Sequence, residues 1–154
     1  MPTRLQLAFT QPTFPKTDNR LLGTWKSDAR RTFADWNWKK GTSPQKKADL
    51  KSIFGKLIVT FTRTKTRADL PHHEWQSSRR YSVLGADETS VAIIEFGEPE
   101  IKNEQRYWAE GVKIAKEFCS KPEIKHIRFD KNHFWISIAN GKHQECFRKI
   151  RSGK

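Results

Sequence analysis

The chain has 154 residues, with 30 Lys and Arg against 17 Asp and Glu, and its formal net charge is +13. A chain of this length fits one domain that buries roughly 70 % of its unfolded surface, so it needs no disulfide or metal to fold. Ten Phe and six Trp supply a core and exclude global disorder. No apolar run approaches the roughly 20 residues of a membrane helix, and we expect no membrane partner.

The chain begins with an expected arm, followed by one strand and two helices. Residues 1–19 contain three prolines and little periodicity, which predicts an extended N-terminal arm, and residues 20–154 form a single domain. The first strand is predicted over 21–28. A short helix is predicted over 29–38, capped by Ser27 or Asp28. A second helix begins after Ser43, with Pro44 at its first position, and ends at Gly55.

Over residues 56–68, apolar and polar residues alternate with a period of two. Leu57, Val59 and Phe61 fall on one face, and threonines fall on the other, which is typical of a strand. The apolar face continues as Arg63, Lys65 and Arg67. This pattern predicts one long strand that leaves the core and runs into solvent.

Five further strands are predicted over 75–84, 90–96, 124–129, 133–139 and 143–150, and turn residues such as Asn140-Gly141 join neighbours. A late amphipathic helix is predicted between Gly97 and Pro122. The tally of about seven sequential strands indicates a mainly β fold, an antiparallel up-and-down barrel.

Gly23-Thr24-Trp25 resembles the first-strand signature of the calycin superfamily, which includes lipocalins and cytosolic fatty-acid-binding proteins. The resemblance implies a lipocalin-like barrel, with Trp25 near its closed end and Arg148 or Arg128 packed over it. The two early helices resemble the lid of the fatty-acid-binding proteins. The Arg-x-Tyr carboxylate anchor of that family is missing from the last strand. The chain most closely resembles short lipocalin-like bacterial proteins without an assigned activity.

The most uniformly apolar strand face in the sequence consists of Phe134, Ile136 and Ile138. With Ile127, Phe129 and Tyr81, this row is expected to line the barrel interior. A barrel of eight strands is either filled by side chains or holds one small ligand, and the sequence leaves both open. Our first hypothesis is a non-enzymatic barrel that binds a small apolar or anionic ligand in these residues.

Three features of the sequence point to anionic partners. Residues 20–80 carry a net charge of +10, which indicates weak, non-specific binding of nucleic acid or a protein-interaction surface, or else a solvated face. Trp36 and Trp38 lie beside lysines and either stack on bases or seal the barrel mouth. His126 and Arg128 share a strand face, which is either an anion site or a solvated surface.

No catalytic motif stands out, and an enzyme that uses the barrel pocket is the third hypothesis. His143 and Glu145 share a face but have no partner nucleophile. Neighbouring residues of an extended chain point to opposite faces, so His72 and His73 are not expected to bind one metal. The two cysteines, Cys119 and Cys146, fit no metal spacing, so no metal or cofactor is expected. The cysteines predict reduced thiols and a cytoplasmic location. The sequence does not predict the oligomeric state.

Overall fold

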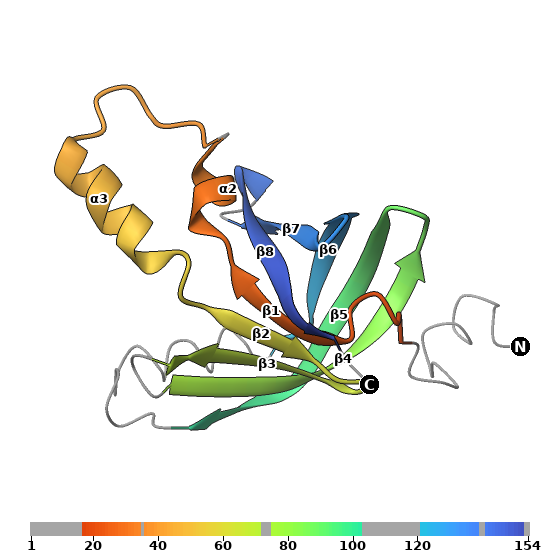
Figure 1. Ribbon diagram of the computed structural model, residues 1–154. Coiled ribbons are helices and arrows are strands. Elements are labelled where there is room, and N and C mark those ends of the chain that lie inside the picture. The colour runs from red at the N-terminus through yellow and green to blue at the C-terminus, as the bar shows by residue number, and fades with distance from the viewer. Residues whose placement is uncertain (1–16, 35, 72–74, 103–120, 139–140, 153–154) are drawn as a thin grey trace, which may run out of the picture.

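The computed structural model describes residues 17–34, 36–71, 75–102, 121–138 and 141–152, and they form a closed barrel of eight antiparallel strands (Figure 1). Each strand pairs with the next in sequence, and β8 closes the barrel against β1. The mainly β, up-and-down barrel predicted from the sequence is confirmed. The predicted late helix, Cys119, His72 and His73 lie outside the described residues.

The strands are β1 (Gly23–Ser27), β2 (Ile58–Phe61), β3 (Lys65–Leu70), β4 (Trp75–Ala86), β5 (Ser90–Lys102), β6 (Glu123–Asp130), β7 (His133–Ile138) and β8 (His143–Ser152). Two helices, α2 (Ala29–Ala34) and α3 (Pro44–Ile53), lie between β1 and β2. Strands β4 and β5 are the longest and extend beyond their predicted ends.

The prediction of one long strand over 56–68 is wrong, because the chain reverses direction between β2 and β3. Phe61 pairs with Thr66 across this hairpin. The turn contains no glycine or proline. Instead, the Thr62 hydroxyl accepts hydrogen bonds from the backbone N–H groups of Thr64 and Lys65. The reversal changes which residues face inward, so Thr66 is buried and Lys65 and Arg67 are exposed.

Both helices begin at the side-chain caps that the sequence offers. The Asp28 carboxylate accepts from the Arg31 backbone N–H at the start of α2, and the Ser43 hydroxyl accepts from the Lys46 backbone N–H at the start of α3. Helix α2 ends at Ala34, four residues before the predicted end. Figure 1 shows α3 projecting away from the strands. Neither helix is long and apolar enough to cross a membrane.

Helix α2 is fixed to β8 by Thr32. The Thr32 hydroxyl accepts a hydrogen bond from the backbone N–H of Cys146 and donates one to the Asp28 carbonyl. Cys146 is a free thiol that is fully buried, and this burial raises its pKa to about 11. At neutral pH the thiol is therefore protonated and a poor nucleophile.

One half of the barrel interior is filled by a continuous aromatic and aliphatic core. Trp25 lies at its centre, 2 % exposed, and its ring centroid is 4.7 Å from that of Phe134. The Trp25 indole N–H donates to the Leu21 carbonyl at 2.9 Å. Further members are Leu21, Phe61, Tyr81, Val83, Val91, Ile93, Ile127 and Phe147. Trp25 therefore belongs to the filled half, near the turn that precedes β1.

Arg20 closes this end of the barrel from outside. Its guanidinium lies 4.6 Å from the centroid of the Phe129 ring and donates to the Glu88 carbonyl at the turn between β4 and β5. The guanidinium also forms an ion pair of 2.7 Å with Asp18, which lowers the pKa of that carboxyl. Arg20 thus ties the segment before β1 to the opposite side of the barrel.

Candidate ligand-binding cavity

The other half of the barrel encloses a cavity of about 740 Å³. It lies at the end where the connections from β1 to β2, β3 to β4, β5 to β6 and β7 to β8 are found. The sequence left open whether the interior is filled or holds a pocket. One half of the barrel is filled, and the other half holds the pocket.

The floor and one wall of the cavity are apolar. Phe61, Phe134 and Phe147 belong both to the core and to the cavity lining, so their rings form the floor. Leu57, Val59 and Ile136 extend the apolar surface toward the opening. A molecule in the cavity would therefore rest on three phenyl rings.

The residues predicted to bind a ligand divide between the two halves. Phe134 and Ile136 line the cavity. Tyr81 and Ile127 are buried in the filled half, and the Tyr81 hydroxyl donates to the Thr62 carbonyl at 2.6 Å. Burial raises the pKa of Tyr81 to about 12. Phe129 is half-buried beneath Arg20, and the side chain of Ile138 lies outside the described residues.

Polar side chains on β3, β5 and β6 form one wall of the cavity. The Glu95 carboxylate lies 3.2 Å from the Lys125 ammonium, and its side chain is 11 % exposed. The Thr66 hydroxyl contacts the same carboxylate at 3.4 Å. The charge of Glu95 is thus balanced by Lys125 within the wall.

A second carboxyl, that of Glu145, lies across the cavity on β8. It accepts a hydrogen bond of 2.7 Å from the Ser27 hydroxyl. The same hydroxyl accepts from the backbone N–H of Gly55, which leads from α3 into β2. Burial raises the pKa of Glu145, and the hydrogen bond from Ser27 opposes this rise. The cavity therefore contains a carboxyl group that holds its proton more tightly than an ordinary glutamic acid.

The raised pKa of Glu145 makes the free energy of unfolding depend on pH. Above the ordinary value of 4.5, the carboxyl loses its proton in the unfolded chain first, so stability falls as pH rises until the folded-state carboxyl also ionises. We expect Glu145→Gln to remove this fall, because an amide keeps the Ser27 hydrogen bond without a charge. Urea unfolding at pH 4 and pH 8 measures the free energy of unfolding of both proteins. The stability of Glu145→Gln relative to wild type should be higher at pH 8 than at pH 4.

Glu123→Gln is the control for this prediction, because Glu123 is exposed at the cavity rim. Its stability difference from wild type should not grow with pH as that of Glu145→Gln does. An equal gain at both pH values for Glu145→Gln would show that the carboxyl is not the source of the pH dependence.

Arg79 is the most deeply buried cation of the cavity wall, at 6 % exposed. Its Nε donates to the Gly97 carbonyl at 2.9 Å, and its Nη2 donates to the Lys121 carbonyl. Among the described residues, its Nη1 has no hydrogen-bond partner. The guanidinium is therefore held by backbone carbonyls, with one N–H direction unused.

The polar wall was missed in the sequence. Arg79 lies two residues from inward-facing Tyr81 on the same strand. Lys125 has the same relation to Ile127. Continuing the alternation outward from each apolar residue would have placed both cations inside. Charge argued against this placement, since charged groups are rarely buried.

The residue packed over Trp25 is not one of the two arginines implied by the family resemblance. Arg148 and Arg128 are exposed, and the Lys149 ammonium lies 5.1 Å from the Trp25 ring centroid. Alternation explains the difference, because Lys149 is two residues from inward-facing Phe147, whereas Arg148 points outward.

The predicted anion pair, His126 and Arg128, lies on the outer face of β6. Both residues are exposed, and neither lines the cavity. Arg128 lies 5.8 Å from the centroid of Trp135 and contacts Gln144 at 3.4 Å. The interior side of this strand belongs to Ile127, as its alternation predicts.

The tryptophans after α2 do not seal the cavity. Trp36 stacks on His143, with ring centroids 3.9 Å apart, and Trp38 stacks on Phe33 at 5.6 Å. Phe54 completes this aromatic cluster by an edge contact with Phe33. The cavity lining includes no residue of α2 or α3. In the described structure the two helices thus form a separate cluster beside the barrel.

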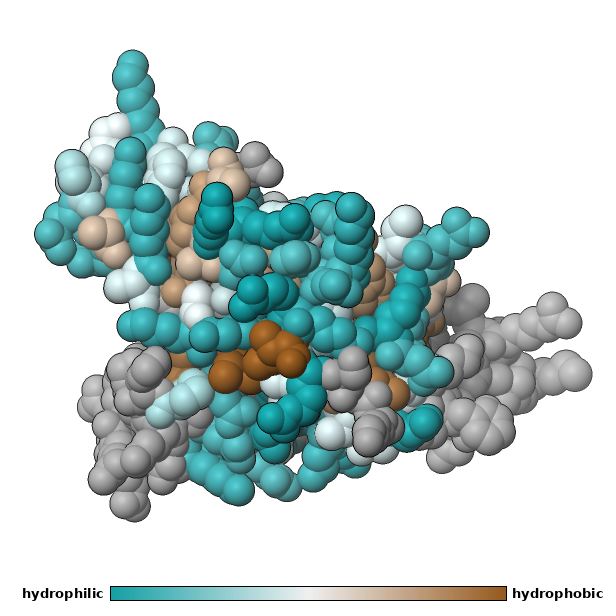
Figure 2. Space-filling view, in the orientation of Figure 1, coloured by the Kyte–Doolittle hydropathy of each residue, from teal (hydrophilic) through white to brown (hydrophobic). Residues whose placement is uncertain are grey.

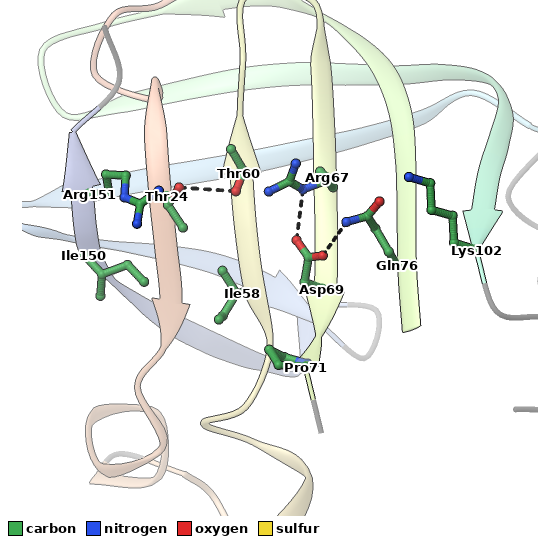
Figure 3. Close-up of a pocket in the computed structure, with 10 residues that line it drawn as sticks. All are labelled: Thr24, Ile58, Thr60, Arg67, Asp69, Pro71, Gln76, Lys102, Ile150 and Arg151. Carbon is green, nitrogen blue, oxygen red and sulfur yellow. Dashed lines mark hydrogen bonds and ion pairs between the residues drawn. The ribbon is translucent and has the colours of Figure 1, made fainter. Parts of the chain in front are cut away.

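A shallow groove of about 500 Å³ crosses the outer face of the barrel (Figure 3). Ile58 and Ile150 lie near each other in it, and Figure 2 shows a hydrophobic patch surrounded by hydrophilic side chains on the side of β1, β2 and β8. Arg67 in this groove is bonded to Asp69 at 3.0 Å. Binding of nucleic acid to the basic surface stays a prediction.

Neither a metal centre nor a known relative identifies the cavity. The described part of the chain contains no cluster of three or more His, Cys, Asp or Glu residues that suits a metal ion. A comparison of the sequence with protein-family models finds no match, and comparisons with curated proteins and with solved structures find none either.

Proposed function

We propose that this chain is a lipocalin-like barrel that binds one small molecule in the open half of its interior. The observation that carries the proposal is the cavity of about 740 Å³ with its floor of three phenyl rings. Small-molecule sites typically occupy roughly 300–1,000 Å³ and combine an apolar lining with a few polar groups. The cavity has this size and this composition.

The resemblance to calycins supports the same proposal. Gly23-Thr24-Trp25 begins β1, and Trp25 is buried in the filled half, opposite the cavity. A cation, Lys149, lies over its ring. A barrel filled at one end and hollow at the other has a rigid base and a single chamber for a ligand. The proposal includes no covalent chemistry.

Native mass spectrometry of the protein purified from its expression host, followed by titration with the neutral dye Nile red, tests the proposal. We expect either a retained small molecule or saturable dye fluorescence with one site per chain. A matched pair of variants locates the site. Ser77 lines the cavity, whereas Ser78 is not part of its lining. Ser77→Trp should fill the cavity and weaken dye binding about tenfold or more, since loss of a few buried contacts exceeds 1.4 kcal/mol.

Ser78→Trp should bind the dye as wild type does. Circular dichroism confirms that both variants are folded. The proposal fails if the purified protein carries no ligand and the dye does not bind, or if the dye binds equally to both variants.

A further inference from the structure

The cavity wall contains a buried positive charge without a described counter-charge. Arg79 bonds to the carbonyls of Gly97 and Lys121, and its Nη1 is unbonded among the described residues. Carbonyl oxygens satisfy N–H groups but carry no net charge. A buried cation is costly unless an anion and a full set of hydrogen bonds compensate its lost hydration.

The carboxyl groups of the lining do not supply this anion. Glu95 is paired with Lys125 at 3.2 Å. Glu145 accepts its hydrogen bond from Ser27 on the far side of the barrel. Glu123 is exposed at the rim, where water screens its charge. Arg79 therefore remains the uncompensated charge of the described lining.

We infer that the ligand of this cavity is a small organic anion, a carboxylate whose charged group binds Arg79 and whose apolar body rests on Phe61, Phe134 and Phe147. This inference rests on the proposed function and names the chemical class of its ligand. Guanidinium and carboxylate form charge-assisted hydrogen bonds, which are stronger than neutral ones. The apolar floor removes one side of the ligand from water, and this burial stabilises an aromatic or aliphatic body.

Binding requires a small adjustment of the wall. Nη1 has less than 1 Å² of exposed surface, although Arg79 lines the cavity. The guanidinium must therefore turn toward the ligand, or the groups that cover it must shift. The new hydrogen bond satisfies Nη1, which is buried and has no partner in the part of the chain that the structure describes, and this gain favours the shift.

The test compares two ligands of the same shape that differ in charge, naphthylacetate and its neutral amide, as competitors of Nile red. We expect wild type to bind the acid about tenfold or more tightly than the amide at pH 7, since hydrogen bonds between two charged groups are stronger than those to a neutral amide. Arg79→Met should abolish this preference. Arg80→Met is the matched control, because Arg80 points outward over the Phe96 ring, and it should keep the preference.

The outcomes separate the two proposals. If Nile red binds and the acid and amide displace it equally from wild type, the carboxylate inference is wrong and the proposed function stands. If Nile red does not bind and the purified protein carries no small molecule, the proposed function fails. The wild-type comparison needs no variant, so it decides the inference even if Arg79→Met does not fold. Retention of the preference in folded Arg79→Met would also overturn it.

Discussion

Replacement of Trp25 by alanine should lower the free energy of unfolding by about 3–5 kcal/mol, the loss found when a large buried aromatic is truncated. Trp25 is 2 % exposed and lies 4.7 Å from Phe134 and 6.5 Å from Phe129, measured between ring centroids. The variant also loses the hydrogen bond to Leu21 and the Lys149 contact. Urea denaturation followed by circular dichroism measures the change.

A domain of this kind has a total stability of about 5–15 kcal/mol, so Trp25→Ala should be partly unfolded under mild conditions. Trp135→Ala is the control, because Trp135 lies half-buried on the outer face of β7 beside Arg128. It should lose far less stability. Equal losses in the two variants would contradict the placement of Trp25 at the centre of the filled half.

Replacement of Phe134 by alanine should cost a similar free energy, about 3–5 kcal/mol, and should also change what the barrel binds. The Phe134 ring touches both halves, because it packs on Trp25 and Phe147 and forms part of the cavity floor. Its removal opens an apolar space beneath the floor. Apolar cavities of this kind stay dry and accept benzene.

Thermal unfolding with and without benzene measures this second effect. Benzene should raise the melting temperature of Phe134→Ala more than that of wild type. Phe96→Ala, which truncates an outer-face ring beneath Arg80, should show neither the large loss nor the benzene effect. A loss below about 1 kcal/mol in Phe134→Ala would mean that the ring is not part of the packed core.

The barrel was predictable because its strands follow one another and alternate clearly. Ile127 has polar neighbours on both sides, and the short turns between strands indicate direct pairing. The hairpin between β2 and β3 was missed because Thr62 makes its turn. Threonines at alternate positions are typical of a strand, so the sequence pattern cannot distinguish a threonine within a strand from one that makes a turn.

The cavity was only partly predictable. The apolar floor follows from alternation on β7, and Phe134 and Ile136 were identified from it. The volume was beyond sequence reasoning, because it depends on how far the side chains of eight strands reach across the barrel. Arg79 and Glu145 face inward by the same alternation, but only the structure shows that their polar atoms are buried.

The pairing of β1 with β8 brings together residues from the two ends of the described chain, and Gly23 lies opposite Ser152. The other seven pairings join strands that are adjacent in sequence. A hairpin between adjacent strands closes a short loop and therefore forms quickly. The pairing of β1 with β8 closes a loop that contains most of the chain, so we expect it to form last. Until β1 pairs with β8, both strands are open edges of the sheet, and either edge can pair with a strand of another copy of the chain. Release of a ribosome-bound chain before β8 has emerged would leave β1 and β7 as open edges, and this state is equally prone to aggregation.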